Sequence, residues 1–289
     1  MMLAAFQGQA YIRTAALARL EECASAGRLT AGAMFVTDGS STPAAALAGS
    51  SDVPTWEAAL GLPGWLAFAI DYCFSRQPAE RVVALTRQLL EAIAPGADLS
   101  GKAGGVVSEV LASIAEEFED RSDEVLPLLG ACAELRRLHI ETMSGGQPSP
   151  AAWRAARKAA TEATNALKDP KAKSLGGCIE AAAWDTVKAP TTVGDVLRLR
   201  GQVSEELIDK LFGWTAEDDQ RTRALLAEMH ENYKQDKPEE ERDVFMLLRE
   251  HHPEAEARLL AYMRFQNAEN AHAAMKANDV FLRAMRALR

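Results

Sequence analysis

Residues 150–168, PAAWRAARKAATEATNALK, predict a helix with one face of mostly small side chains. The residues that recur at steps of three and four along it are Trp153, Ala156, Ala160, Ala163 and Leu167. At this spacing they share one side of the helix, where alanine lets another backbone approach closely. We therefore expect this face to pack in a helical core and to carry no chemistry.

The same periodicity recurs along the chain and favours an all-α fold, as a multi-helix bundle or a stacked helical array. Alanine dominates an apolar fraction of 48%, and aromatic residues make up only 6%, a balance typical of helical proteins. Residues 27–53, rich in Gly, Ser, Thr and Ala, are the least regular segment. They leave room for one short β-hairpin or strand near residues 33–50.

A chain of 289 residues allows one large domain or two ordinary ones. The clearest linker is SGGQPSP at 144–150, which combines Gly, Pro and Ser. We expect an N-terminal helical domain over 1–143, including the irregular segment, and a C-terminal helical domain over 150–289. Short connectors also allow the two halves to pack as one unit.

Four local signals organise the second half. A short helix is expected around Ile179–Val187. Thr192 with Asp195, and Thr215 with Asp218, have the spacing of capping boxes, in which each residue bonds to the other's backbone. Pro253 opens a long final helix, with an interruption expected near residues 267–270.

Charge and targeting signals narrow the class of protein. A net charge of −9 argues against a general nucleic-acid binder and against an anionic membrane surface. The apolar run Trp65–Ile70 ends at Asp71, far short of a membrane span, and the N-terminus lacks a signal peptide. The four cysteines are widely spaced, which favours reduced thiols and a cytoplasmic location.

No chemical motif is complete. His139-Ile-Glu141 has the HxE of zinc deaminases but no PCxxC follows, and Glu269 with His272 has no second ExxH pair for a di-iron site. Gly101–Gly105 opens a helix, but no strand precedes it as in a phosphate-binding loop. We predict no catalytic residue, no cofactor and no metal.

Two charge clusters remain. Residues 116–124 carry six acidic groups and one Arg, whereas residues 154–173 carry six basic groups against two acidic ones. Either both are solvated faces, or they are complementary patches that join subunits or bind a partner. The candidate interface residues are Trp153, Arg154, Arg157, Lys158, Glu116, Glu117, Glu119 and Asp120.

Two landmarks precede these clusters, LGLPGWL at 60–66 and LEAIAPGADL at 90–99. Within the second, Asp98 is expected to accept a hydrogen bond from a backbone N–H of the turn. Together with the Ala-rich helix at Trp153, they resemble the landmarks of an uncharacterised family of bacterial helical proteins, over roughly residues 10–170. The resemblance implies a helical fold and assigns no activity. The cysteine-containing loop common in that family is replaced here by residues 32–52, which hold no cysteine.

These observations favour a non-catalytic cytoplasmic protein that binds another protein: an adaptor, an inhibitor or an immunity-like binder, with self-association left open. The alternative is an enzyme or small-ligand-binding protein with a pocket between helices. Several histidines and cysteines gathered around one deep pocket would favour that alternative.

Overall fold

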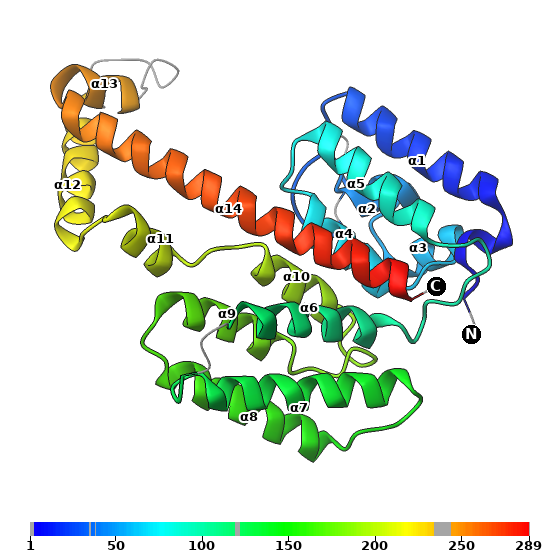
Figure 1. Cartoon of the computed structure of the whole chain (residues 1–289). Coiled ribbons are helices and arrows are strands. Elements are labelled where there is room, and N and C mark those ends of the chain that lie inside the picture. Colours follow the sequence, from blue (N-terminus) through cyan, green and yellow to red (C-terminus); the bar gives the residue numbers. More distant parts are fainter. Residues whose placement is uncertain (1–2, 35, 38, 119–121, 234–243, 289) are drawn as a thin grey trace. The chain divides into compact units, whose positions relative to one another are not determined.

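The computed structural model describes residues 3–288 apart from 35, 38, 119–121 and 234–243. Its regular structure is helical, which confirms the predicted all-α class (Figure 1). The helices are η1 (Ala5–Gly8), α1 (Ala10–Ser25), α2 (Pro43–Ala48), α3 (Val53–Leu60), α4 (Gly64–Phe74), α5 (Ala79–Ala92), α6 (Ala103–Glu117), α7 (Leu126–Met143), α8 (Pro150–Ala166), α9 (Pro170–Ala181), α10 (Thr192–Arg200), α11 (Glu205–Phe212), α12 (Ala216–Tyr233), α13 (Val244–His251) and α14 (Pro253–Ala287). No helix in these described ranges is both long and apolar enough to cross a bilayer.

The chain forms two compact units. Unit 1 comprises Met1–Gln202 and Ala273–Arg289, and unit 2 comprises Val203–His272. The connector 144–150, where we expected a domain boundary, joins α7 to α8, and these two helices pack against each other inside unit 1. The chain therefore passes out of unit 1 after residue 202 and returns to it at residue 273, within α14.

Helix α8 packs through the face that the sequence predicts. Trp153 is 4% exposed and Ala160 is fully buried, and α7 and α9 are the neighbours of this helix. The side chain of Ser149 caps the helix by accepting a hydrogen bond from the Ala152 N–H at 3.1 Å. On the α9 side, a Cβ on Gly176 would lie 2.5 Å from Thr164 Oγ1, so glycine permits this close approach.

The irregular segment of unit 1 contains helix α2 and no strand within its described residues. Only two isolated bridges form there, from Leu29 and from Val36 to Ser41. Polar groups of the segment bond instead to one side chain of α4. Asp71 Oδ1 accepts a hydrogen bond from the Ala44 N–H at 2.7 Å. Its Oδ2 accepts from the Met34 N–H at 2.6 Å and from Thr42 Oγ1 at 2.8 Å. These bonds fasten the segment to the core of unit 1.

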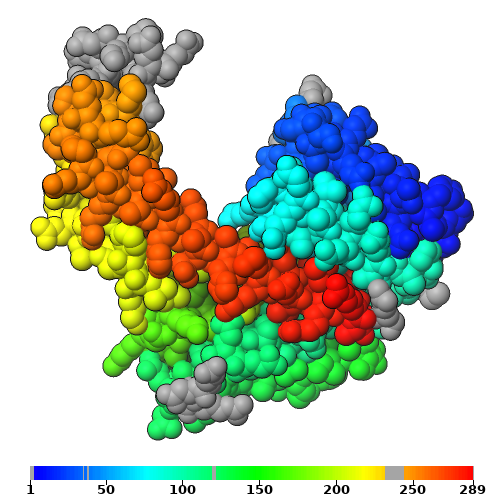
Figure 2. Space-filling model, turned by 45° about the horizontal axis from the view of Figure 1, so that its top comes forward, coloured from blue at the N-terminus to red at the C-terminus, as the bar shows by residue number. Residues whose placement is uncertain are grey.

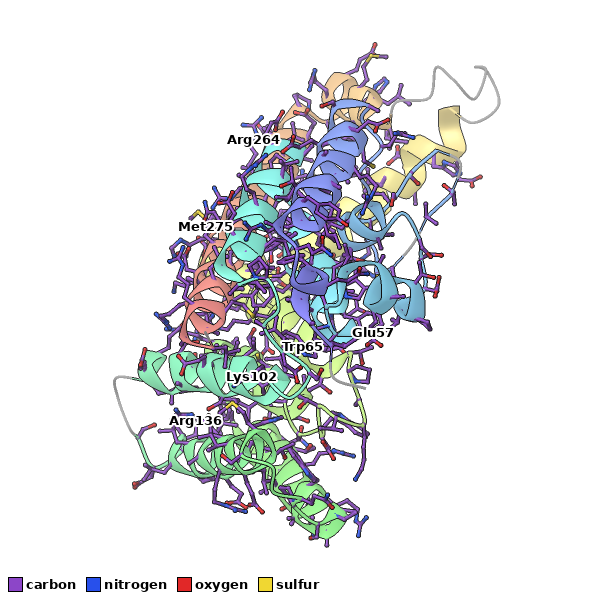
Figure 3. All side chains as sticks on the ribbon, turned by 90° about the vertical axis from the view of Figure 1, so that its right-hand side faces the viewer. Glu57, Trp65, Lys102, Arg136, Arg264 and Met275 are labelled. Carbon is purple, nitrogen blue, oxygen red and sulfur yellow. The ribbon has the colours of Figure 1, made fainter. Side chains whose placement is uncertain are left out.

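The two landmarks of the N-terminal half meet in space. Trp65, labelled in Figure 3, donates from Nε1 to the Leu99 carbonyl at 3.2 Å. In the turn before Leu99, Asp98 Oδ1 accepts from the Ser100 N–H at 2.9 Å, which confirms its predicted role. On the surface of unit 1, α1 (blue) and α5 (cyan) lie side by side in Figure 2. Arg87 of α5 pairs with Glu21 of α1.

Two helix predictions in the second half of unit 1 are wrong. The helix expected around Ile179–Val187 instead begins at Pro170 and ends at Ala181, because Asp169 caps it by accepting from the Ala172 N–H at 3.0 Å. The Thr192–Asp195 capping box does not form: Thr191 is the N-cap of α10, and its side chain makes no capping bond.

Unit 2 contains an aromatic cluster with an ion pair beside it. Phe212, Trp214 and Tyr262 pack together, with the Trp214 and Tyr262 rings stacked at 4.4 Å between centroids. Arg258 pairs with both carboxylate oxygens of Asp218, at 2.7 and 2.6 Å. The Thr215–Asp218 capping box is confirmed, because Asp218 accepts from the Thr215 N–H and donates its own N–H to the Thr215 hydroxyl. Helix α14 runs through residues 267–270 without the expected interruption.

Candidate functional site

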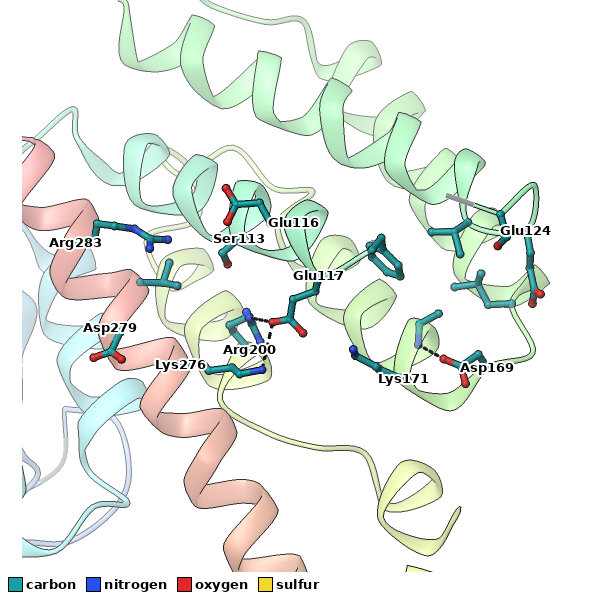
Figure 4. A pocket seen from close by; sticks show the side chains of 16 residues that line it. Ser113, Glu116, Glu117, Glu124, Asp169, Lys171, Arg200, Lys276, Asp279 and Arg283 are labelled. Carbon is teal, nitrogen blue, oxygen red and sulfur yellow. Dashed lines mark hydrogen bonds and ion pairs between the residues drawn. The ribbon is translucent and has the colours of Figure 1, made fainter. Parts of the chain in front are cut away.

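An open groove of about 760 Å³ lies on unit 1, where the end of α6, the start of α9, the end of α10 and the last part of α14 meet (Figure 4). Its charged lining residues are Glu116, Glu117, Glu124, Asp169, Lys171, Arg200, Lys276, Asp279 and Arg283. Phe118, Val125, Leu167, Ala172 and Val280 are its apolar lining residues. The groove therefore combines charges of both signs with a smaller apolar part.

Glu117 joins two cations in the groove. Its Oε1 accepts from Arg200 Nη2 and lies 3.9 Å from Lys276 Nζ, as the dashed lines in Figure 4 show. The side chain of Arg200 is only 6% exposed, whereas that of Lys276 is 46% exposed. Two positive charges thus share one carboxylate oxygen, and one of the two cations is buried.

A close approach of the residue after α10 to α14 brings these cations together. Arg200 is the last residue of α10, and Gly201 follows it. A Cβ on Gly201 would lie 3.4 Å from Ala274 Cα and from Ala277 Cβ, so the end of α10 approaches α14 closely. Lys276 leaves α14 at this crossing. Although Arg200 lines the groove, its Nε is buried and has no hydrogen-bond partner among the described residues.

Other charged groups in the groove wall have two different roles. Glu124 accepts from the Lys168 N–H at 2.6 Å, and Asp169 caps α9. Glu116, Lys171, Asp279 and Arg283 are exposed and form no ion pair with other residues that the structure describes. Here we call these four the rim residues. They remain available to an occupant of the groove.

The acidic half of the predicted interface is found at this groove. Glu116 is a rim residue and Glu117 pairs with Arg200. Glu119 and Asp120 lie outside the described residues. Within the chain, the cations that pair with Glu117 come from α10 and α14. The pairing of this acidic cluster with the basic helix α8 of another subunit stays a prediction.

The basic half of the predicted interface, on α8, is not part of the groove wall. Trp153 is buried against His139, with 4.9 Å between ring centroids. Arg157 stacks over the Trp184 ring at 3.4 Å from its centroid, and Lys158 pairs with Glu162 along the helix at 3.7 Å. Arg154 is exposed and has no ion-pair partner within the described part of the chain. The structure thus keeps Arg154 and Lys158 on a separate solvated face.

Sequence reasoning missed the cations of the groove. Arg200 lies in the last turn of α10, where a basic residue usually needs no further explanation than the helix dipole. Lys276, Asp279 and Arg283 recur at steps of three and four on α14, which places them on one helix face. That spacing was the available signal, but it does not tell which helix lies opposite.

No histidine or cysteine is among the residues that line this groove. His139 donates from Nε2 to the Ala182 carbonyl at 2.7 Å, and burial lowers its pKa to about 4. All four cysteines are free and buried, and burial raises the pKa of Cys132 to about 11 and that of Cys178 to about 12. Within the described residues, no three His, Cys, Asp or Glu side chains are placed to hold a metal ion.

No family model, no curated protein and no solved structure matches the chain. The bacterial family that the landmarks resemble therefore stays a prediction. The chemistry that the groove offers is ion pairing and hydrogen bonding by its charged and polar side chains. Of its two serines, Ser113 donates its hydroxyl to the Val110 carbonyl of its own helix at 2.7 Å.

Proposed function

We propose that this protein is a non-catalytic binding protein that receives a segment of another protein in the groove of unit 1. The observation that carries the proposal is the composition of the groove wall. Small-molecule sites are mostly enclosed and apolar with a few polar groups, whereas polar, charged rims are typical of protein–protein contacts. This groove is open and has five acidic and four basic side chains in its wall. Such a wall suits a polypeptide with charged side chains.

The four rim residues support a role in recognition. Each is exposed, and among the described residues none has an ion-pair partner whose loss would oppose binding. Charges of this kind set the encounter rate and the choice of partner more than the final affinity. They also explain how an acidic protein can select a partner without one large patch of a single sign.

Partner capture from the native host tests the proposal. The groove variant is Lys171→Glu with Arg283→Glu, and the matched control is Arg154→Glu with Lys158→Glu on α8. Both pairs change the charge equally, and all four residues are exposed. We expect the wild type and the α8 control to retain the same cross-linked partner and the groove variant to lose it. Sizing of each purified protein reports whether that partner is a second copy.

Loss of the partner from the α8 control alone would contradict the proposal and assign binding to the basic face of α8. Equal capture by all three proteins would also contradict it. A small molecule retained through purification by the wild type but not by the groove variant would support the ligand-binding alternative instead.

A further inference from the structure

We infer that Arg200 and Lys276 form a carboxylate-binding site in the groove, here called the anchor. In the complex, an Asp or Glu side chain of the bound segment replaces Glu117 on these two cations. This inference rests on the proposed function, because it specifies the chemistry of the segment that the groove receives. It identifies Glu117 as an internal occupant of the site. In the free protein Glu117 neutralises cations that a partner's acidic side chain neutralises in the complex.

The first observation that supports this inference is the buried guanidinium of Arg200. Arg200 is more than nine-tenths buried, lines the groove, and has no acceptor for its Nε among the described residues. A buried donor without an acceptor is costly, and arginine binds a carboxylate best through two parallel N–H donors. Glu117 satisfies Nη2 alone. A carboxylate placed side-on takes both Nε and Nη2, so the exchange satisfies one more donor.

The net charge at the anchor also favours an acidic occupant. Arg200 and Lys276 together carry two positive charges, and Glu117 supplies one negative charge. Lys276 Nζ lies 3.9 Å from the shared oxygen, a long contact that leaves it able to turn toward a second carboxylate. The anchor therefore retains an excess of positive charge that favours an acidic occupant.

The rim selects a carboxylate over a phosphate. Glu116 and Asp279 are exposed in the same wall as the anchor, and both disfavour a group with two negative charges. They equally favour basic residues on either side of the anchoring acid. The occupant that fits best is a segment with a single acidic side chain flanked by basic or neutral residues.

Anisotropy of a labelled peptide tests the anchor. The probe is a Ser–Lys-rich peptide with one central Glu, and its counterpart has Gln at that place. Glu117 competes with the peptide for the anchor, so the apparent affinity of the wild type is reduced in proportion to the fraction of molecules whose anchor is open. Glu117→Gln removes this competition and is expected to tighten binding of the Glu peptide about tenfold. Glu117→Asp, which keeps the charge on a shorter side chain, should give a smaller gain. Lys276→Gln should weaken binding, and Lys158→Gln on α8 should not change it.

Melting and circular dichroism of each variant establish that it is folded. The inference is overturned if Glu117→Gln leaves affinity for the Glu peptide unchanged, or if the Gln peptide binds equally well. Tighter binding of a phosphoserine counterpart than of the Glu peptide would also overturn it. So would glutarate binding as strongly as the peptide, since the occupant would then be a small acid.

The two proposals fail separately. If the groove variant loses its natural partner while Glu117→Gln changes nothing, the groove binds protein without this anchor. If the Glu peptide binds as expected but every variant captures the same partner, the carboxylate site stands and the proposed function does not.

Discussion

Asp71 shows how one buried side chain can organise a segment far from it in the chain. It is fully buried, and it bonds to backbone or hydroxyl groups of Met34, Thr42 and Ala44. Burial raises the pKa of its carboxyl to about 6, although the three donated hydrogen bonds oppose that shift. A carboxyl whose pKa is higher in the folded state binds its proton more tightly there. Its contribution to stability is therefore complete below the unfolded pKa near 4 and is lost as pH rises through about 6.

The first prediction compares wild type with Asp71→Asn, which cannot titrate. Between pH 7.5 and pH 4.5, the unfolding free energy of the wild type should rise by about 2 kcal/mol relative to that of the variant. Urea unfolding of both proteins at the two pH values measures this double difference, in which the contributions of the other titrating groups cancel. A difference of opposite sign would mean that the hydrogen bonds outweigh burial and hold this pKa below its usual range.

The sequence could not predict this role of Asp71. There it is the polar residue that ends an apolar run, and its partners come from the segment with the least periodicity. Asp98 was predictable because its partner, the Ser100 N–H, lies two residues away. Local hydrogen bonds follow from spacing, whereas remote ones depend on which elements the fold brings together.

At the scale of single helices, packing faces were predictable and some boundaries were not. The small-residue face of α8 is buried as its periodicity indicates. The misplaced start of α9 has a clear cause: Asp169-Pro170 is a start signal, but Gly176 and Gly177 argue against a helix interior. Gly176 is tolerated because it packs against Thr164 of α8, a reason that only the tertiary structure shows.

The second prediction uses two glycines in neighbouring helices. A Cβ on Gly104 of α6 would lie 2.8 Å from the His139 carbonyl oxygen of α7, so Gly104→Ala should cost about 1–3 kcal/mol by overpacking. Gly130 of α7 is exposed and has nothing within 4 Å of its Cβ position. Gly130→Ala should stabilise the protein by about 0.5–1 kcal/mol through helix propensity. Thermal melting compares the two, and shifts of the same sign would refute the close contact of α6 with α7.

At the scale of the whole molecule, composition predicted the helical class but not the groove. The groove joins residues of α6, α9, α10 and α14, which are far apart along the chain. The acidic cluster at 116–124 singled out Glu116 and Glu117 in the sequence. Arg200 and Lys276 were not singled out, because a lone cation on a helix has no local pattern that marks it as buried or shared.

The third prediction concerns the last part of α14 and the thiols of unit 1. Phe281 is fully buried against Phe74, with 5.7 Å between ring centroids, so Phe281→Ala should cost about 3–5 kcal/mol. The four cysteines all belong to unit 1. In the Phe281→Ala variant, their labelling by a thiol reagent in native buffer should accelerate in proportion to the loss of stability. Met275→Ala, at a residue 40% exposed on the same helix, serves as the control and should change neither stability nor labelling much. Rapid labelling of the wild type would contradict the burial of these thiols.

The course of α14 also has a consequence for synthesis. In the sequence, unit 1 is made of a segment before unit 2 and a segment after it. Its core includes Phe281, Ala284 and Met285 from the second segment. A ribosome must therefore translate all of residues 203–272 before it delivers these side chains. Until then the earlier helices of unit 1 expose the apolar surface that α14 covers later. Unit 2 has its full sequence first and is free to fold while unit 1 still awaits its last helix.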